Sequence, residues 1–156
     1  MGLKAKLSEI VDAMECQSEE MTPYLNHETG EVRTMPSEVI IAAENNEDSQ
    51  EIMDTYGCDE QDIKTAQEIN QGEQWIPLPS QYDIHEYKIM ERFCNSPKDP
   101  HTRELLTVAI SGKGAFRRFK DTADRLGLLD AWYEFRKKEF EEIAKEWCKE
   151  NEVECG

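Results

Sequence analysis

The spacing of apolar side chains at the start of the chain predicts a helix. They recur every three or four residues and so share one helix face: Leu3, Leu7, Ile10, Val11 and Met14. Glu9 and Asp12 interrupt them, whereas a secretory signal peptide has a continuous apolar centre. We therefore expect an amphipathic helix over residues 3–15 and no signal peptide.

The next segment has the pattern of a β-hairpin. Two short strand-like stretches flank Glu28, Thr29 and Gly30, and glycine can adopt the positive φ that closes a short hairpin loop. We expect this hairpin over residues 21–34. The segment 75–79 contains two prolines, which remove backbone donors, and it is expected to be an edge strand beside the hairpin.

The remaining periodic stretches predict further helices. Asp99 and Pro100 form a start signal, and Gly112 is the expected C-cap of the helix that follows. The expected helices cover residues 37–45, 50–56, 60–70, 80–94, 100–112, 115–127 and 128–151. The fold class is therefore α+β: a helix-dominated single domain, residues 1–156, with a small antiparallel sheet built from the N-terminal β-hairpin and the edge strand.

Charge is divided unevenly along this chain of net charge −16. Residues 1–87 carry 4 basic and 20 acidic side chains, whereas residues 98–138 carry 10 basic and 6 acidic ones. Net charge governs solubility and association and says little about fold. The overall charge disfavours direct binding to nucleic acid or to an anionic membrane, and it makes the basic segment the part to examine.

The centre of that segment is a candidate anion-binding site. A lysine lies between two glycines, just before a helix start that offers free backbone N–H groups and a partial positive charge. Glycine lets the backbone approach a ligand closely, and the cations add charge and hydrogen-bond donors. We call this group the basic corner; its members are Lys113, Gly114, Arg117, Arg118 and Lys120.

A purely structural interpretation of the basic corner stays open. Gly112 can end one helix while Gly114 relieves a tight turn. The pairs Arg117–Asp121 and Lys120–Asp124 are four residues apart and can form ion pairs on the helix surface. The segment is not a Walker phosphate loop, because the G-x-x-x-x-G-K-[ST] pattern is absent.

The helix of this segment has an apolar side of its own. Phe116, Phe119, Ala123 and Leu126 recur at spacings of three and four residues. We expect them to form one buried stripe, with Arg117 and Arg118 pointing away from it.

Two segments resemble a known family. The stretch YLNHETGEV (residues 24–32) looks like its hairpin signature, and GKGAFRRFKD (residues 112–121) looks like its strongest motif. Trp132 and Trp147 on the last helix are similar too. The family is the uncharacterised bacterial protein family 0158 (UPF0158). The resemblance covers most of the chain, least over residues 44–74, and implies no activity, ligand or catalytic residue.

Residues for catalysis or metal binding lack a recognisable arrangement. The three histidines have no H-x-x-x-H spacing, the five cysteines have no Cys-x-x-Cys pair, and no G-x-S-x-G elbow is present. We assign no catalytic residue, metal or cofactor. The lack of a long apolar stretch and of a signal peptide leads us to expect a cytoplasmic protein that does not enter the membrane.

We favour a small binding or regulatory protein whose basic corner contacts an anionic small molecule or an acidic patch of a partner. The alternative is an acidic inhibitor or nucleic-acid mimic, which docks residues 1–87 on a basic protein such as a nucleic-acid enzyme. A third hypothesis, a phosphoryl- or nucleotide-directed hydrolase, has the least support. It requires His85, Glu86, Cys94 or Glu28 to converge with the basic corner. The sequence leaves the oligomeric state open.

Overall fold

The computed structural model describes residues 3–72 and 74–156 and divides the chain into two compact units. Unit 1 comprises Met1–Asp83 and Ile143–Gly156, and unit 2 comprises Ile84–Glu142. The expectation that the whole chain is one domain stays a prediction. The helix-dominated α+β class is confirmed, and the antiparallel sheet lies in unit 1.

The sheet of unit 1 has the strand order β3-β2-β4. Its strands are β2 (Met21–Asn26), β3 (Val32–Pro36) and β4 (Trp75–Pro77). In β2, Tyr24 pairs with Arg33 on one side and with Pro77 on the other, both antiparallel. The hairpin and the edge strand are therefore confirmed, although β3 continues to Pro36 where the sequence predicted an end at residue 34.

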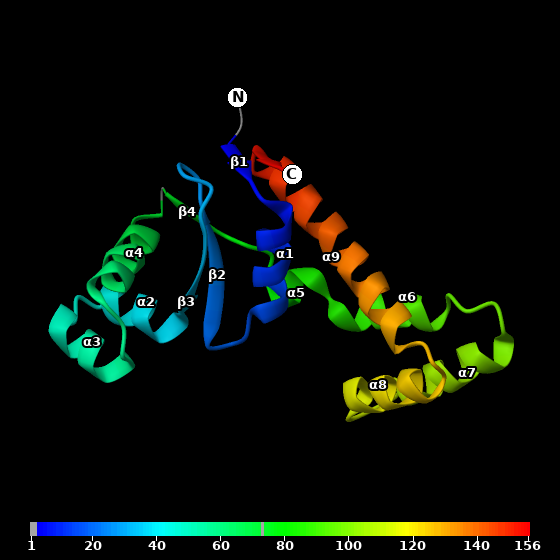
Figure 1. The fold of residues 1–156 in the computed structure, drawn as a ribbon. Coiled ribbons are helices and arrows are strands. Elements are labelled where there is room, and N and C mark those ends of the chain that lie inside the picture. Colours follow the sequence, from blue (N-terminus) through cyan, green and yellow to red (C-terminus); the bar gives the residue numbers. More distant parts are fainter. Residues whose placement is uncertain (1–2, 73) are drawn as a thin grey trace. The chain divides into compact units, whose positions relative to one another are not determined.

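Helices cover both faces of this sheet (Figure 1). The helix α1 (Leu7–Cys16) contacts β2 and β3 on one face. On the other lie α2 (Ser37–Glu44), α3 (Ser49–Tyr56) and α4 (Glu60–Gln71), close to their predicted ranges. The core between these three helices and β3 is aliphatic and consists of Met35, Val39, Ile40, Ala42, Ile52, Ile63 and Ala66.

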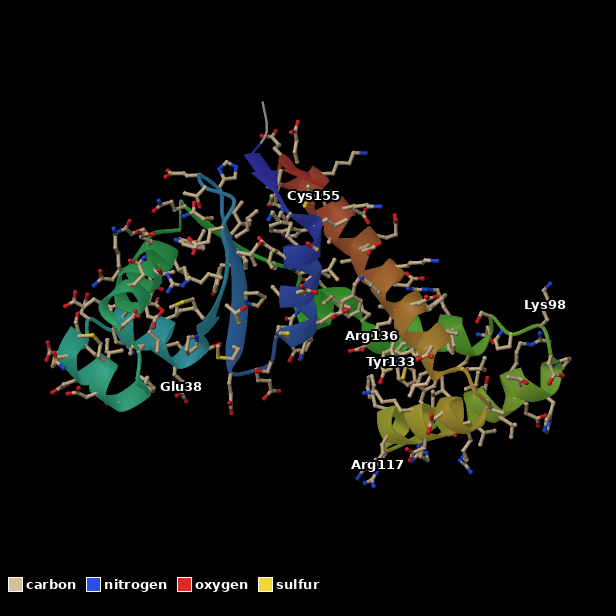
Figure 2. The ribbon with its side chains drawn as sticks, viewed as in Figure 1. Glu38, Lys98, Arg117, Tyr133, Arg136 and Cys155 are labelled. Atoms are coloured by element: carbon tan, nitrogen blue, oxygen red, sulfur yellow. The ribbon has the colours of Figure 1, made fainter. Side chains whose placement is uncertain are left out.

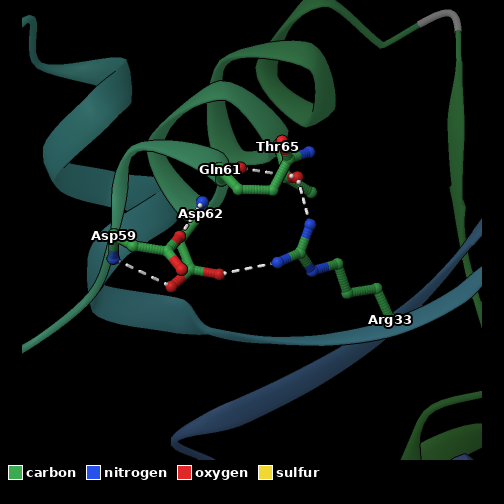
Figure 3. A network of polar contacts seen from close by, with 5 residues as sticks. All are labelled: Arg33, Asp59, Gln61, Asp62 and Thr65. Atoms are coloured by element: carbon green, nitrogen blue, oxygen red, sulfur yellow. Dashed lines mark hydrogen bonds and ion pairs between the residues drawn. The ribbon is translucent and has the colours of Figure 1, made fainter.

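A polar network fastens β3 to α4 (Figure 3). The guanidinium of Arg33 donates from Nη2 to Oδ1 of Asp62 at 2.9 Å and from Nη1 to Oγ1 of Thr65 at 2.8 Å. The Thr65 hydroxyl, which is buried, donates in turn to the carbonyl of Gln61 at 2.9 Å. Asp62 also closes a capping box with Asp59 at the start of α4. The side chain of Arg33 therefore holds α4 at two successive turns.

The helix predicted over residues 3–15 is wrong in its first turn. Residues Leu3–Ala5 form the strand β1, which pairs in parallel with β5 (Val153–Cys155), and α1 begins only at Leu7. The backbone N–H of Leu7 donates to the carbonyl of Gly156, which continues this pairing into the helix start. The strand partner lies at the far end of the chain, so local spacing could not reveal it.

The helix predicted from residue 80 to residue 94 is broken at His85. The structure has α5 (Gln81–Ile84) and α6 (Glu86–Cys94), and His85 between them takes φ of 53°. Apolar residues continue at helical spacing through the break, because Ile84 is buried like Ile89. The left-handed backbone at His85 therefore leaves no mark on the pattern.

Unit 2 is built from α6, α7 (Pro100–Ala109), α8 (Ala115–Arg125) and the first part of α9 (Leu129–Glu150). Asp99 caps α7 through the backbone N–H groups of His101 and Thr102, which confirms the predicted start. The predicted C-cap is wrong, because α7 is capped by Ile110, two residues before Gly112. The ring of Trp132 lies 4.8 Å from that of Phe119 and 5.4 Å from that of Phe93, measured between centroids.

The predicted stripe of α8 is buried only in its middle. Phe119 and Ala123 are fully buried, whereas Phe116 is 47% exposed. Phe116 lies in the first turn of α8, where its outer part meets solvent, so the prediction of one continuous buried stripe is wrong at this residue. Within the described part of the chain, no helix combines the length and the apolar character that crossing a membrane requires.

Candidate functional site

The basic corner lies in the turn between α7 and α8, inside unit 2. Gly112 and Gly114 both have positive φ, of 79° and 75°, and Gly114 directly precedes α8. Because glycine at this N-cap has no side chain, it provides no capping bond to the first N–H groups of α8. The helix therefore begins with open backbone donors beside the exposed Lys113.

Arg118 is directed back at the chain's own backbone. Its Nε donates to the carbonyl of Ala109 at 3.2 Å, and its two Nη atoms donate to the carbonyls of Lys113 and Ser111. These carbonyls belong to the end of α7 and the turn that follows, where helical partners are missing. At this residue the structural interpretation of the corner has direct support.

The other cations of the corner are exposed to solvent. Lys113, Arg117 and Lys120 form no hydrogen bond or ion pair with any residue that the structure describes. Arg117 projects from α8 away from the ribbon (Figure 2). The two ion pairs that the sequence allowed, with Asp121 and Asp124, are therefore not formed in the described chain. Three cations remain available to a ligand.

An apolar groove runs between α7 and α8, with a volume of about 600 Å³. Val108 is 66% exposed and Leu105 is 39% exposed along it, and Arg118 and Arg125 line its α8 side. Nothing in the sequence distinguishes this partly open apolar side from a buried helix face.

A smaller pocket of about 280 Å³ is enclosed by α6, α8 and α9, all within unit 2. Its lining combines four aromatic side chains, one thioether and three charged groups: Phe116, Phe119, Trp132, Tyr133, Met90, Glu86, Lys120 and Arg136. Arg136 donates from Nε to Oε1 of Glu86 at 2.5 Å. Lys120 is the residue that this pocket shares with the basic corner.

Three residues of the hydrolase hypothesis lie in unit 2 with the basic corner: His85, Glu86 and Cys94. Cys94 is buried, and burial raises the pKa of its thiol from 9.0 to about 11, so it is protonated at neutral pH. His85 is exposed at the helix break. Glu86 lines the small pocket with Lys120 but is paired with Arg136. Glu28 lies in unit 1 and accepts a hydrogen bond from Gln74.

The small pocket and most of its lining could not be predicted from the sequence. The pattern identified Trp132 as one of several apolar residues of the last helix, and it gave no role to Tyr133 or Arg136. The pocket forms only where three helices meet, and this meeting depends on contacts between distant residues. The sequence placed Phe116 in a buried stripe, so its exposure beside Lys120 is known only from the structure.

Comparison with known proteins gives a single finding. The model of a family described as Uncharacterised protein family (UPF0158) matches residues 6–155. No curated protein and no solved structure matches the chain.

Proposed function

The chain belongs to the uncharacterised protein family UPF0158, and we propose that it is a small binding protein that holds an oxyanion at its basic corner. The proposal rests on three cations that are exposed and, in the described chain, unpaired. Lys113, Arg117 and Lys120 are exposed and have no carboxylate partner among the described residues.

An anion fits this corner for electrostatic reasons. Cations in the first turns of a helix are unfavourable, because the helix start itself carries a partial positive charge. A phosphate or carboxylate placed there accepts bonds from the open N–H groups of α8 and offsets the repulsion between the cations. Arg118 keeps the turn in shape and so acts as a positioning residue in this proposal.

The proposed ligand is an anionic small molecule or an acidic patch of a partner protein. The proposed cellular location is the bacterial cytoplasm. The proposed cytoplasmic location rests on the sequence, in which neither a signal peptide nor a long apolar stretch is recognised. We propose a binding role without catalysis, since within unit 2 the Cys94 thiol is buried with a raised pKa and Glu86 is paired with Arg136.

Titration with inorganic phosphate, pyrophosphate and a short RNA tests the proposal. The double variant Lys113→Gln/Arg117→Gln is expected to weaken anion binding by about tenfold or more at low salt. The matched control is Lys137→Gln/Lys138→Gln, which removes two exposed cations from α9 in the same unit. Calorimetry or amide chemical shifts measure the anion affinity of the two double variants. Equal affinity in the two double variants, or no binding by the unaltered protein, removes the proposal.

A second candidate function is favoured by the division of charge between the units. Unit 1 contains 6 basic and 23 acidic residues, whereas unit 2 contains 12 basic and 11 acidic ones. The net negative charge of the protein is therefore confined to unit 1. We propose, as the alternative, that this unit docks on a basic protein such as a nucleic-acid enzyme, as an inhibitor or a nucleic-acid mimic.

Capture of partners from a bacterial lysate separates this alternative from the first proposal. Docking through unit 1 should weaken steeply between low and high salt. The triple variant Glu44→Gln/Glu47→Gln/Glu51→Gln, which neutralises exposed carboxylates of unit 1, should lose the partner. The Lys113→Gln/Arg117→Gln variant should keep it. A partner retained equally at all salt concentrations contradicts the alternative.

A further inference from the structure

Trp132 has a buried hydrogen-bond donor without an acceptor. The side chain is 2% exposed, and its Nε1 has no partner among the described residues. Buried indole N–H groups usually find an acceptor, because a lost bond to water is otherwise uncompensated. In unit 1, by contrast, Nε1 of Trp75 donates to Oε2 of Glu68 at 2.9 Å. The indole N–H of Trp132 therefore stays unsatisfied by the described residues.

The surroundings of Trp132 form a fixed wall. Its ring makes edge contacts with Phe119, at 4.8 Å and 78°, and with Phe93, at 5.4 Å and 64°. Phe93 also contacts Phe119 and Phe135. Aromatic groups packed in this way hold one another in place, so the side of Trp132 that lines the small pocket is preorganised.

The pocket in front of this wall suits a flat, apolar body. Its volume of about 280 Å³ lies at the lower end of the range for ligand sites, which admits about one ring with a small substituent. Phe116 and Tyr133 line it and are 47% and 48% exposed, so each offers part of an aromatic ring to a ligand. Figure 2 shows Tyr133 and Arg136 on the first half of α9.

The charges of the pocket favour a single negative charge on the ligand. Glu86 and Arg136 pair with each other, so their charges offset. Lys120 adds a cation that has no partner in the described chain. An oxyanion could accept from the Trp132 N–H and from the Lys120 ammonium, while the attached ring packs against Phe116 and Tyr133.

We propose that unit 2 contains a small-molecule site for a planar, ring-bearing carboxylate, formed by Trp132, Lys120, Phe116 and Tyr133. The site adjoins the basic corner at Lys120, but it does not rest on the function proposed there. The carboxylate satisfies the indole donor, and the ring covers the two exposed aromatic side chains.

Benzoate is the probe, and the indole N–H signals in a ¹⁵N–¹H correlation spectrum are the readout. The Trp132 signal is expected to move downfield and to saturate as benzoate is added, because its N–H gains an acceptor. The Trp75 signal is an internal control and should stay in place, since that N–H already has Glu68 as its acceptor. Acetate, which lacks the ring, and benzamide, which lacks the charge, should both bind at least about tenfold more weakly.

Variants test the two polar contacts. Lys120→Gln should weaken benzoate binding about fivefold, while Lys137→Gln, on an exposed part of α9, should leave it unchanged. Trp132→Phe should weaken it at least about tenfold and also identifies the signal. Trp132 packs in the core, so the unaltered protein and Lys120→Gln carry the test if Trp132→Phe loosens the fold.

Three results would overturn the proposal. The first is a Trp132 signal that stays unmoved at millimolar benzoate, because the N–H then gains no acceptor from the ligand. The second is equal binding of benzamide and benzoate. The third is equal benzoate affinity in Lys120→Gln and Lys137→Gln. The Lys113→Gln/Arg117→Gln variant should bind benzoate normally, so failure of the oxyanion proposal leaves this one standing, and the reverse also holds.

Discussion

A Cβ atom on Gly114 would lie 3.1 Å from Nη1 of Arg118, so the glycine and the arginine occupy their places together. The guanidinium reaches over Gly114 to the carbonyls of Ala109, Ser111 and Lys113. The GKGAFRRFKD segment is thus a structural turn at Gly114 and Arg118 and an open cationic surface at Lys113 and Arg117. The two interpretations offered by the sequence apply to different residues of one motif.

The two glycines of this turn should respond differently to alanine. Both have positive φ, so either substitution is expected to lower the free energy of unfolding by about 1–2 kcal/mol. Gly112 has nothing within 4 Å of an added Cβ, whereas at Gly114 the added methyl crowds Arg118. Gly114→Ala should therefore cost about 1 kcal/mol more than Gly112→Ala, which urea denaturation measures. Equal losses would show that the guanidinium moves aside freely.

The two adjacent arginines should also differ. Arg118→Ala removes three bonds to backbone carbonyls and is expected to lower the free energy of unfolding by about 1–2 kcal/mol. Arg117→Ala, on an exposed side chain without a partner in the described chain, should change it by less than about 0.5 kcal/mol. Thermal unfolding of both variants under one buffer condition is the measurement. A larger loss in Arg117→Ala contradicts the assignment of roles.

Most helices and strands could be predicted from the sequence, because their apolar spacing and turn residues lie close together along the chain. The hairpin at Gly30, the start of α7 at Asp99 and the helices α2, α3 and α4 follow from residues close in sequence. The strands β1 and β5 come from opposite ends of the chain and pair with each other. Each has three residues, which is too few to show an alternation of apolar and polar positions. The break at His85 is a single backbone angle within a continuous apolar pattern.

The candidate site could be predicted only in part. The motif identified the five residues of the basic corner, but it could not show that Arg118 turns back while Arg117 faces solvent. Neighbours on a helix point about 100° apart, and which of them meets a free carbonyl depends on the preceding turn. The pocket at Trp132 could not be predicted from the sequence, because its lining residues come from three separate helices, α6, α8 and α9.

The network of Arg33 should contribute measurably to the stability of unit 1. Arg33→Ala breaks the bonds to Asp62 and Thr65 and is expected to lower the free energy of unfolding by about 1–3 kcal/mol. Both side chains of the ion pair are about one quarter exposed, so the lower half of this range is expected. Lys64→Ala, an exposed neighbour on α4, is the control and should be nearly neutral. Chemical denaturation of both decides whether Arg33 fastens α4 to the sheet.

Burial of two thiols should make the protein less stable in alkaline solution. Burial raises the pKa of Cys94 from 9.0 to about 11, and burial together with the neighbouring Cys155 thiol raises that of Cys148 to about 12. Below pH 9 both thiols are neutral in the folded and the unfolded chain, so their contribution is fully present. As pH rises further, only the unfolded chain loses these protons, so stability falls until the folded pKa is reached. Each thiol contributes a slope of at most about 1.4 kcal/mol per pH unit.

The variant Cys94→Ala isolates one of these thiols. Its stability below pH 9 is lower by a constant amount, because a buried side chain is truncated. Between pH 9 and 11 its stability should fall less steeply than that of the unaltered protein, and above pH 11 the two curves should run parallel again. Tyr24, whose pKa burial also raises, titrates in both proteins and cancels in the difference. Urea denaturation at half-unit pH steps measures the curves. Parallel curves throughout would mean that the Cys94 thiol ionises as easily in the folded chain as in the unfolded one.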